Sequence, residues 1–250
     1  MFVFILSLLS LILSLVGLLI FFKKLDFNIS KNGLWILGLL LVVSFLLSAF
    51  LSPLSHRFFM DESFYMGGAK NIVATGDLVL DSMDYPKQPA WPLILSIPFF
   101  FEVSSNVAIW FTLFISLLGI LAFYYLSRLL YDENRALFVT SLYTLFALRI
   151  FWSASAETAM VSSLFVFLSL ALMLVAFRKD DWQLYLLSII LVGFTFQIRS
   201  ENLLLVLPFL FLCWKHKRLK WMFSLLIPFV FASLYNAYSL RNFYVRAYQG

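Results

Sequence analysis

Long apolar runs separated by polar connections constrain the fold of this chain more than any other feature. The first 22 residues carry no charged side chain, and comparable runs recur along the sequence. Crossing the ~30 Å hydrocarbon layer of a bilayer takes about 20 apolar residues. Charged residues make up only 12% of the chain, against about 25% in a soluble domain. We therefore expect an all-α fold, a polytopic transmembrane helical bundle.

Eight membrane spans are predicted. Segment 1–22 lacks a basic start and is longer than the apolar core of a signal peptide, so we interpret it as a retained helix. Residues 1–33 would form this extra helix and a cytoplasmic loop, and 34–250 the main membrane module. A polar connection at about 53–91 is expected to carry short interfacial helices. The predicted spans are 1–22, 34–52, 106–129, 136–150, 160–177, 183–198, 202–214 and 222–240.

The basic residues orient this bundle. The connections around residues 23–31, 128–135, 178–181 and 215–220 carry 11 of the 18 Lys and Arg but 5 of the 13 Asp and Glu. Basic residues are enriched in cytoplasmic loops, so this side is predicted to be cytoplasmic. Both termini and the long connection 53–91 are then extracytoplasmic. The positive net charge is a topology signal, and we expect no nucleic-acid partner.

The long connection contains an acidic pair followed by a helical pattern. Asp61 and Glu62 come first, and Gly76 is a plausible end of the helix. The apolar positions at helical spacing are Tyr65, Ala69, Ile72 and Val73. The pattern predicts a short amphipathic helix lying in the membrane interface. Asp61 has two interpretations: a helix cap, which is a favoured role for Asp, or a functional carboxylate.

Charged residues also occur in two later extracytoplasmic connections. Glu157 lies in one, and Arg199 and Glu201 in the other, where they interrupt an apolar run and predict a tight hairpin. A charge at the bilayer centre costs about 2.5–3.5 kcal/mol and often marks a functional site. Arg199 has a simpler interpretation as a partner of Glu201. Tyr65 and Trp91 are favoured as aromatic anchors at the membrane interface.

These residues resemble the GT-C glycosyltransferases, which include protein O-mannosyltransferases and lipid A aminoarabinose transferases. The acidic pair Asp61-Glu62 is similar to the acidic motif in the first large outer loop of that family. Three further segments resemble the family in the same order: Pro89–Leu93, Phe151–Glu157 and Arg199–Leu203. The resemblance covers about residues 34–240. The extra helix 1–22 departs from it. Family members are commonly longer, so we expect a minimal module, a truncated chain or a partner-dependent subunit.

The resemblance implies transfer of a sugar from a polyisoprenyl-phosphate donor to an extracytoplasmic acceptor, with inversion at the anomeric carbon. The acceptor would be a protein, a lipid or a glycan. Asp61 would be the general base, supported by or exchanging that role with Glu62, and Arg199 would hold the donor phosphate. The other predicted substrate-binding residues are Glu157, Glu201, Arg57, Tyr65 and Lys87. The single cysteine and two separated histidines indicate no metal site; no cofactor is indicated, and a divalent metal stays open.

Two other functions remain as alternatives. A transporter or flippase of lipid-linked intermediates would have paired inverted repeats, and the sequence shows no internal repeat. A non-catalytic assembly subunit would act only with a membrane protein partner. In each case the chain contacts membrane lipid, and we expect it in the cell membrane, or in the endoplasmic reticulum of a eukaryote. The active site of an enzyme would be extracytoplasmic.

Overall fold

The computed structural model describes residues 8–9, 11–12, 29–51, 60–76, 88–226 and 230. Every regular element in these residues is a helix, so the predicted all-α class is confirmed. Most of the predicted helix 1–22 and of the span 222–240 lies outside the described residues. Arg57 and Lys87 lie outside them as well.

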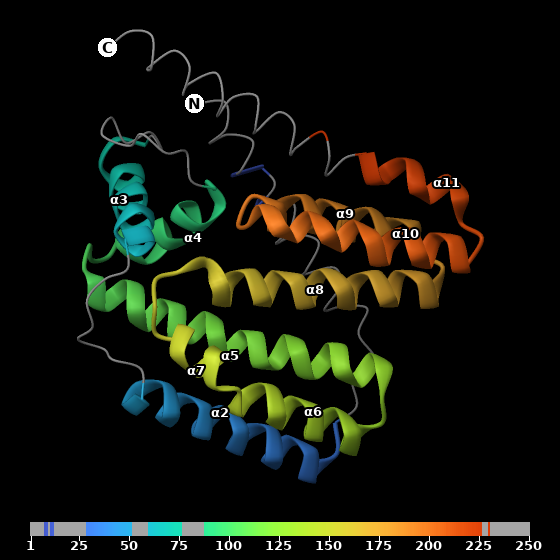
Figure 1. Ribbon diagram of the computed structural model, residues 1–250, viewed down its shortest axis with the longest axis horizontal. Helices are drawn as coiled ribbons and strands as arrows, with labels where there is room; N and C mark the ends of the chain where they lie inside the picture. The colour runs from blue at the N-terminus through green and yellow to red at the C-terminus, as the bar shows by residue number, and fades with distance from the viewer. Residues whose placement is uncertain are drawn as a thin grey trace, which may run out of the picture.

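Among the described residues, three helices, α2, α5 and α8, are long and apolar enough to cross a membrane. Figure 1 shows the longer helices side by side along the long axis of the molecule, with α3 lying across them at one end. The helices are α2 (Lys31–Leu51), α3 (Met60–Thr75), α4 (Ala90–Phe99), α5 (Ser105–Leu130), α6 (Glu133–Leu145), α7 (Ala147–Trp152), α8 (Thr158–Lys179), α9 (Trp182–Phe196), the 3₁₀ helix η1 (Ser200–Leu205), α10 (Val206–Lys215), α11 (Leu219–Met222) and the 3₁₀ helix η2 (Phe223–Leu225).

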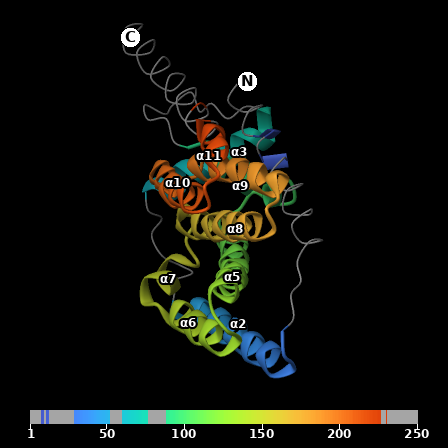
Figure 2. The ribbon, with the colours of Figure 1, turned by 90° about the vertical axis from the view of Figure 1, so that its right-hand side faces the viewer.

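The bundle is layered around α8, which packs between α5 and α9 (Figure 2). α6 packs on α5, and α2 lies against both of them. The outer face of α2 is apolar and exposed; Trp35, for example, is 73% exposed. In water such a face would be unstable, whereas in a bilayer it meets lipid tails. The packing therefore agrees with the membrane bundle that the sequence predicts.

Capped ends keep the connections at one end of the bundle short. The Asp132 side chain accepts a hydrogen bond from the N–H of Arg135 at the start of α6. Asp181 does the same for the first turn of α9, and Asp180 before it adopts a left-handed backbone (φ 51°). Such side chains satisfy the free N–H groups of a first helical turn. Each pair of consecutive helices can thus reverse direction within a few residues.

The two predicted sets of connections lie at opposite ends of the bundle. At one end, the Ser30 hydroxyl donates to Glu133 over 2.6 Å, and Arg218 pairs with Asp180. We call this the basic end. At the other end, α3, α4, the segment 153–157 and the turn 197–200 come together, and we call it the α3 end (Figure 1). For the connections that the structure describes, the grouping inferred from charge is therefore correct.

Two predicted spans differ in detail from the structure. The span 136–150 is not one helix, because Phe146 is extended (φ −65°, ψ 121°) and separates α6 from α7. The span 202–214 begins with the 3₁₀ helix η1 and becomes α-helical only at Val206. The predicted hairpin at 199–201 is confirmed. α10 returns along α9, since the Tyr185 hydroxyl lies 3.3 Å from the Cys213 sulfur.

Candidate functional site

α3 forms the centre of the candidate site, and its apolar stripe is buried as the sequence predicts. Tyr65, Ala69 and Ile72 are buried along one face, and the helix is followed by Gly76 with a left-handed backbone (φ 71°). α3 packs closely on α4, because Gly68 leaves room for a proline. A Cβ at this position would lie 3.2 Å from Pro92 Cβ. The short helix with a buried apolar stripe, predicted from residue spacing, is thus confirmed, while its position in the membrane interface stays a prediction.

Glu62 ties α3 to the segment between α7 and α8. Its carboxyl group is fully buried, and one oxygen accepts hydrogen bonds from the Ser155 hydroxyl (2.5 Å) and the Ala156 N–H (2.8 Å). Buried polar groups are retained where such partners satisfy them. Asp61, one residue earlier, is only partly buried in the first turn of α3. The two neighbouring carboxyl groups therefore have different surroundings.

Trp91 braces the same segment from the side of α4. Its indole N–H donates to the Ala156 carbonyl over 2.7 Å, and its ring stacks on Phe111 at 6.3 Å. Trp91 is fully buried, so its predicted role as a membrane-interface anchor is wrong. Tyr65 is buried as well and is not such an anchor either. Both bulky side chains pack inside the protein, next to the start of α8. The gain from burying them there outweighs the preference of aromatic rings for the membrane interface.

Replacing Trp91 with Phe should destabilise the protein while leaving an aromatic ring in place. The substitution removes the donor to the Ala156 carbonyl, and leaving a buried polar group unsatisfied costs about 1–3 kcal/mol. Trp110→Phe is the matched control, because Trp110 is 48% exposed and stacks on Phe45 at the surface. Thermal unfolding in detergent should show a drop of several degrees for W91F. Equal unfolding temperatures of the two variants would contradict this role.

The turn after α9 is held from two sides. The Ala90 N–H donates to the Gln197 carbonyl (3.2 Å), which joins the turn to the start of α4. The Asn202 amide donates to the Ser162 hydroxyl and to the Thr195 carbonyl, both over 2.9 Å. Between these anchors Arg199 reaches Glu201 at 3.5 Å, with the Arg199 side chain 43% exposed. The hydrogen bonds on both sides therefore fix the backbone of the turn, and the Arg199 guanidinium that this turn carries stays partly exposed.

Three of the predicted charged residues act electrostatically on the Tyr65 phenol. Burial raises the pKa of Tyr65 to about 12, with further contributions from the charges of Glu157 and Asp61. A hydrogen bond with the Thr158 side chain and the charge of Arg199 oppose this rise in pKa. The carboxylates of α3 and of the 153–157 segment and the guanidinium of the 197–200 turn thus lie within electrostatic reach of one hydroxyl. We call Asp61, Tyr65, Glu157 and Arg199 the Tyr65 cluster.

Glu201 lies at the edge of this cluster. Hydrogen bonding to its own backbone lowers the pKa of Glu201, and Arg199 contributes to the same effect. In the described part of the chain, no three His, Cys, Asp or Glu side chains are arranged to hold a metal ion. The cluster therefore offers carboxylates, a phenol and a guanidinium as its chemical groups.

Several supporting residues escaped the sequence analysis. Ser155 and Ala156 hold Glu62, while Gln197 and Asn202 fix the arginine turn. Small residues and single amides are common in loops, so their types carried no signal. Ser155 and Ala156 lie within Phe151–Glu157, and Asn202 within Arg199–Leu203, so the resemblance of these two segments to the family could have suggested them.

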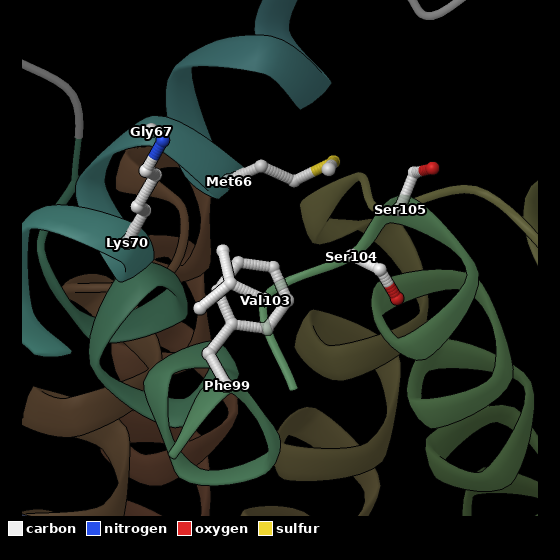
Figure 3. Close-up of a pocket in the computed structure, with 7 residues that line it drawn as sticks. All are labelled: Met66, Gly67, Lys70, Phe99, Val103, Ser104 and Ser105. Atoms are coloured by element: carbon white, nitrogen blue, oxygen red, sulfur yellow. The ribbon is translucent and has the colours of Figure 1, made fainter. Parts of the chain in front are cut away.

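A separate pocket of about 160 Å³ opens on another side of α3 (Figure 3). Its lining residues are Met66, Gly67, Lys70, Phe99, Val103, Ser104 and Ser105. The lining contains one ammonium group and two hydroxyls but no carboxylate. It shares no residue with the Tyr65 cluster and offers no general base.

Comparison with known proteins decides the family. The model of the dolichyl-phosphate-mannose-protein mannosyltransferase family matches residues 84–236, more than half of the chain. The chain belongs to this family. No curated protein and no solved structure was found to match. The membership confirms the predicted resemblance to GT-C enzymes, and the protein is an integral membrane glycosyltransferase of the GT-C type.

The family match covers the Tyr65 cluster unequally. Glu157, Arg199 and Glu201 fall inside the matched segment, whereas Asp61 and Tyr65 precede it. The two parts are nevertheless joined in space, since Glu62 binds the backbone of Ala156. α3 is thus hydrogen-bonded to the segment that the family model matches.

Proposed function

We propose that this family member transfers a sugar, with inversion, from a polyisoprenyl-phosphate donor to an extracytoplasmic acceptor at the Tyr65 cluster. The supporting observation is that Asp61, Glu157 and Arg199, from three separate connections, all act electrostatically on the buried Tyr65 phenol. The family is named for a dolichyl-phosphate-linked mannose, which fits a lipid-linked donor. The α3 end would face the extracytoplasmic side, because the opposite end carries most of the basic residues.

The chemistry requires one base and one cation. A phosphate group leaves without a proton, since its second pKa is about 6, so no acid is needed for the departing group. The acceptor hydroxyl or amine needs a carboxylate that removes its proton. We assign this role to Asp61, which is only partly buried. Glu62 would instead position α3, because the Ser155 and Ala156 hydrogen bonds occupy one of its oxygens.

The cation would be Arg199. Its planar guanidinium suits phosphate oxygens, and charge-assisted hydrogen bonds of this kind are strong. Binding the donor phosphate would require it to exchange its 3.5 Å contact with Glu201. A tyrosine keeps its proton at neutral pH because its ordinary pKa is about 10, and the raised pKa of Tyr65, about 12, extends this to alkaline pH. It would therefore act as a hydrogen-bond donor beside Glu157.

The test is a transfer assay with the purified chain in liposomes. The donor is a polyprenyl-phosphate sugar with a labelled sugar, and a nucleotide sugar with the same label is the comparison. We expect the label to leave the lipid phosphate and to enter an acceptor only from the polyprenyl donor. Movement of intact donor across the bilayer without bond cleavage would overturn the proposal and favour a flippase. Activity that requires a second membrane protein would favour an assembly subunit.

Glu62→Gln separates a positioning role from a catalytic one. Glutamine keeps a carbonyl oxygen for the Ser155 and Ala156 donors, so we expect the folded protein to retain transfer within about tenfold of wild type. Glu62→Leu removes the acceptor, and its unfolding temperature should fall because two buried donors lose their partner, at about 1–3 kcal/mol. The measurements are the transfer rate and the thermal unfolding temperature. A loss of rate in E62Q as large as the loss caused by replacing Asp61 with Asn would instead make Glu62 the base.

A further inference from the structure

The pocket that Lys70 lines lies at the corner where α3, the end of α4 and the start of α5 meet (Figure 3). We call it the Lys70 pocket. One side carries the Lys70 ammonium of α3, and the other carries the hydroxyls of Ser104 and Ser105 at the start of α5. The apolar side chains between these two sides are those of Met66, Phe99 and Val103. The pocket therefore combines groups that donate hydrogen bonds with an apolar surface.

The polar groups of the Lys70 pocket are available to a ligand. Lys70 is exposed, and within the described residues it forms neither an ion pair nor a hydrogen bond. The Ser105 hydroxyl likewise has no partner in the part of the chain that the structure describes. The Ser104 hydroxyl accepts a hydrogen bond from the Val107 N–H over 3.3 Å, but it keeps its own proton to donate. Glu102, the nearest carboxylate along the chain, is exposed and does not line the pocket.

The Lys70 pocket lies at the depth of lipid headgroups. α5 is long and apolar enough to cross a membrane. Counting 1.5 Å per residue from Arg128, at the basic end, to Ser105 gives roughly 35 Å. This length exceeds a hydrocarbon layer of ~30 Å, so Ser105 lies at the edge of that layer on the side of the α3 end. Phe100 and Phe101, just before it in the chain, are 67% and 91% exposed. Aromatic rings are favoured at a membrane interface, which agrees with this depth.

The volume of the pocket limits what it can hold. About 160 Å³ is less than the roughly 300–1,000 Å³ of a site that encloses a whole drug-sized ligand. A phosphate group with the adjoining part of a headgroup needs less room than such a ligand, whereas a sugar together with its lipid would not be enclosed. Phosphate oxygens accept hydrogen bonds from ammonium and hydroxyl groups, and the ammonium also supplies the opposite charge. Depth, size and chemistry thus favour the same kind of ligand.

We propose that the Lys70 pocket binds the phosphate of an anionic membrane lipid in the leaflet on the side of the α3 end. The Lys70 ammonium would pair with the phosphate, and the Ser104 and Ser105 hydroxyls would donate hydrogen bonds to it. The apolar lining would contact the glycerol and the first carbons of the acyl chains. The site shares no residue with the Tyr65 cluster and does not rest on the proposed reaction. A lipid bound there would hold the start of α5 against α3.

The test measures how fast the Lys70 amine is acetylated in the whole protein, purified in dodecyl maltoside, a detergent without phosphate. Phosphatidylglycerol, diacylglycerol with the same acyl chains, and inorganic phosphate are added separately, and peptide mass spectrometry gives the rate at each lysine. Phosphatidylglycerol should slow acetylation of Lys70 several-fold, because the phosphate covers the amine, and diacylglycerol should not. An equal effect of inorganic phosphate would support the phosphate site and identify free phosphate as its source. An equal effect of diacylglycerol would overturn the proposal.

Two controls separate a built site from a general attraction of lysine to anionic micelles. Lys31 is exposed at the start of α2, at the basic end, and its acetylation should change little. Ser105→Ala removes one donor of the pocket and leaves both Lys70 and the Ser104 cap of α5 in place, so the protection of Lys70 should fall several-fold while Tm stays close to that of the wild type. Equal protection of Lys31 and Lys70, or full protection of Lys70 in folded S105A, would overturn the proposal.

Discussion

Replacing Asp61 with Asn should lower the rate of sugar transfer by about 10²–10⁴-fold, the contribution that a general base typically makes. Asparagine has nearly the same size and is tolerated at helix starts as well as Asp is, so α3 should persist. The change removes the carboxylate that would accept the proton of the incoming acceptor. The measurement is the rate of transfer from a labelled polyprenyl-phosphate sugar at saturating donor.

Asp132→Asn is the matched control for this substitution. Asp132 also starts a helix, where it caps α6, but it lies at the basic end. D132N should transfer sugar at a rate close to that of the wild type. A D61N enzyme with unimpaired transfer, in folded form, would show that Asp61 only stabilises α3.

Replacing Arg199 with Ala should weaken use of the donor by about 10²–10³-fold, the usual effect of removing one group that stabilises developing charge. The guanidinium is the cation of the Tyr65 cluster, and without it the departing phosphate would meet the carboxylates of Asp61 and Glu157 uncompensated. The effect should appear in kcat/KM for the donor. Arg199→Lys should recover part of it, because an ammonium keeps the charge but loses the planar fork.

Two controls separate phosphate binding from a local ion pair. Arg218 has nearly the same exposure as Arg199, 44% against 43%, and pairs with Asp180 at the basic end. R218A should leave transfer unchanged. Glu201→Gln removes the partner of Arg199 and should have a small effect. If E201Q is as impaired as R199A, the pair itself, and not the phosphate contact, is what the enzyme needs.

The sequence predicts the helices and the direction of the bundle because both depend on patterns of apolar and charged residues that are local in the chain. Apolar runs defined the membrane helices, and the distribution of Lys and Arg grouped the connections by end. The stripe of Tyr65, Ala69 and Ile72 indicated α3, and Arg199 with Glu201 marked the hairpin. In each case the necessary information lies within a few residues of the feature.

The parts that were missed depend on contacts between distant segments. Glu62 and Asp61 are neighbours in sequence, yet only Glu62 is buried, because the Ser155 and Ala156 donors from another connection receive it. The residue type of Trp91 favours the membrane interface, but its side chain is buried, bonded to the Ala156 carbonyl and stacked on Phe111. The extended backbone at Phe146 could not be predicted, because no Gly or Pro stands beside it to signal a helix break.

If the proposed function holds, a lipid-linked sugar binds at the Tyr65 cluster. The most direct measurement is photo-cross-linking with a polyprenyl-phosphate sugar that carries a diazirine on the sugar, followed by mass spectrometric mapping of the labelled peptides. We predict labels in α3 and in the segments 153–158 and 197–202, suppressed by an excess of unlabelled donor. Specific labels confined to the basic end, at 178–182 or 215–220, would contradict the claim.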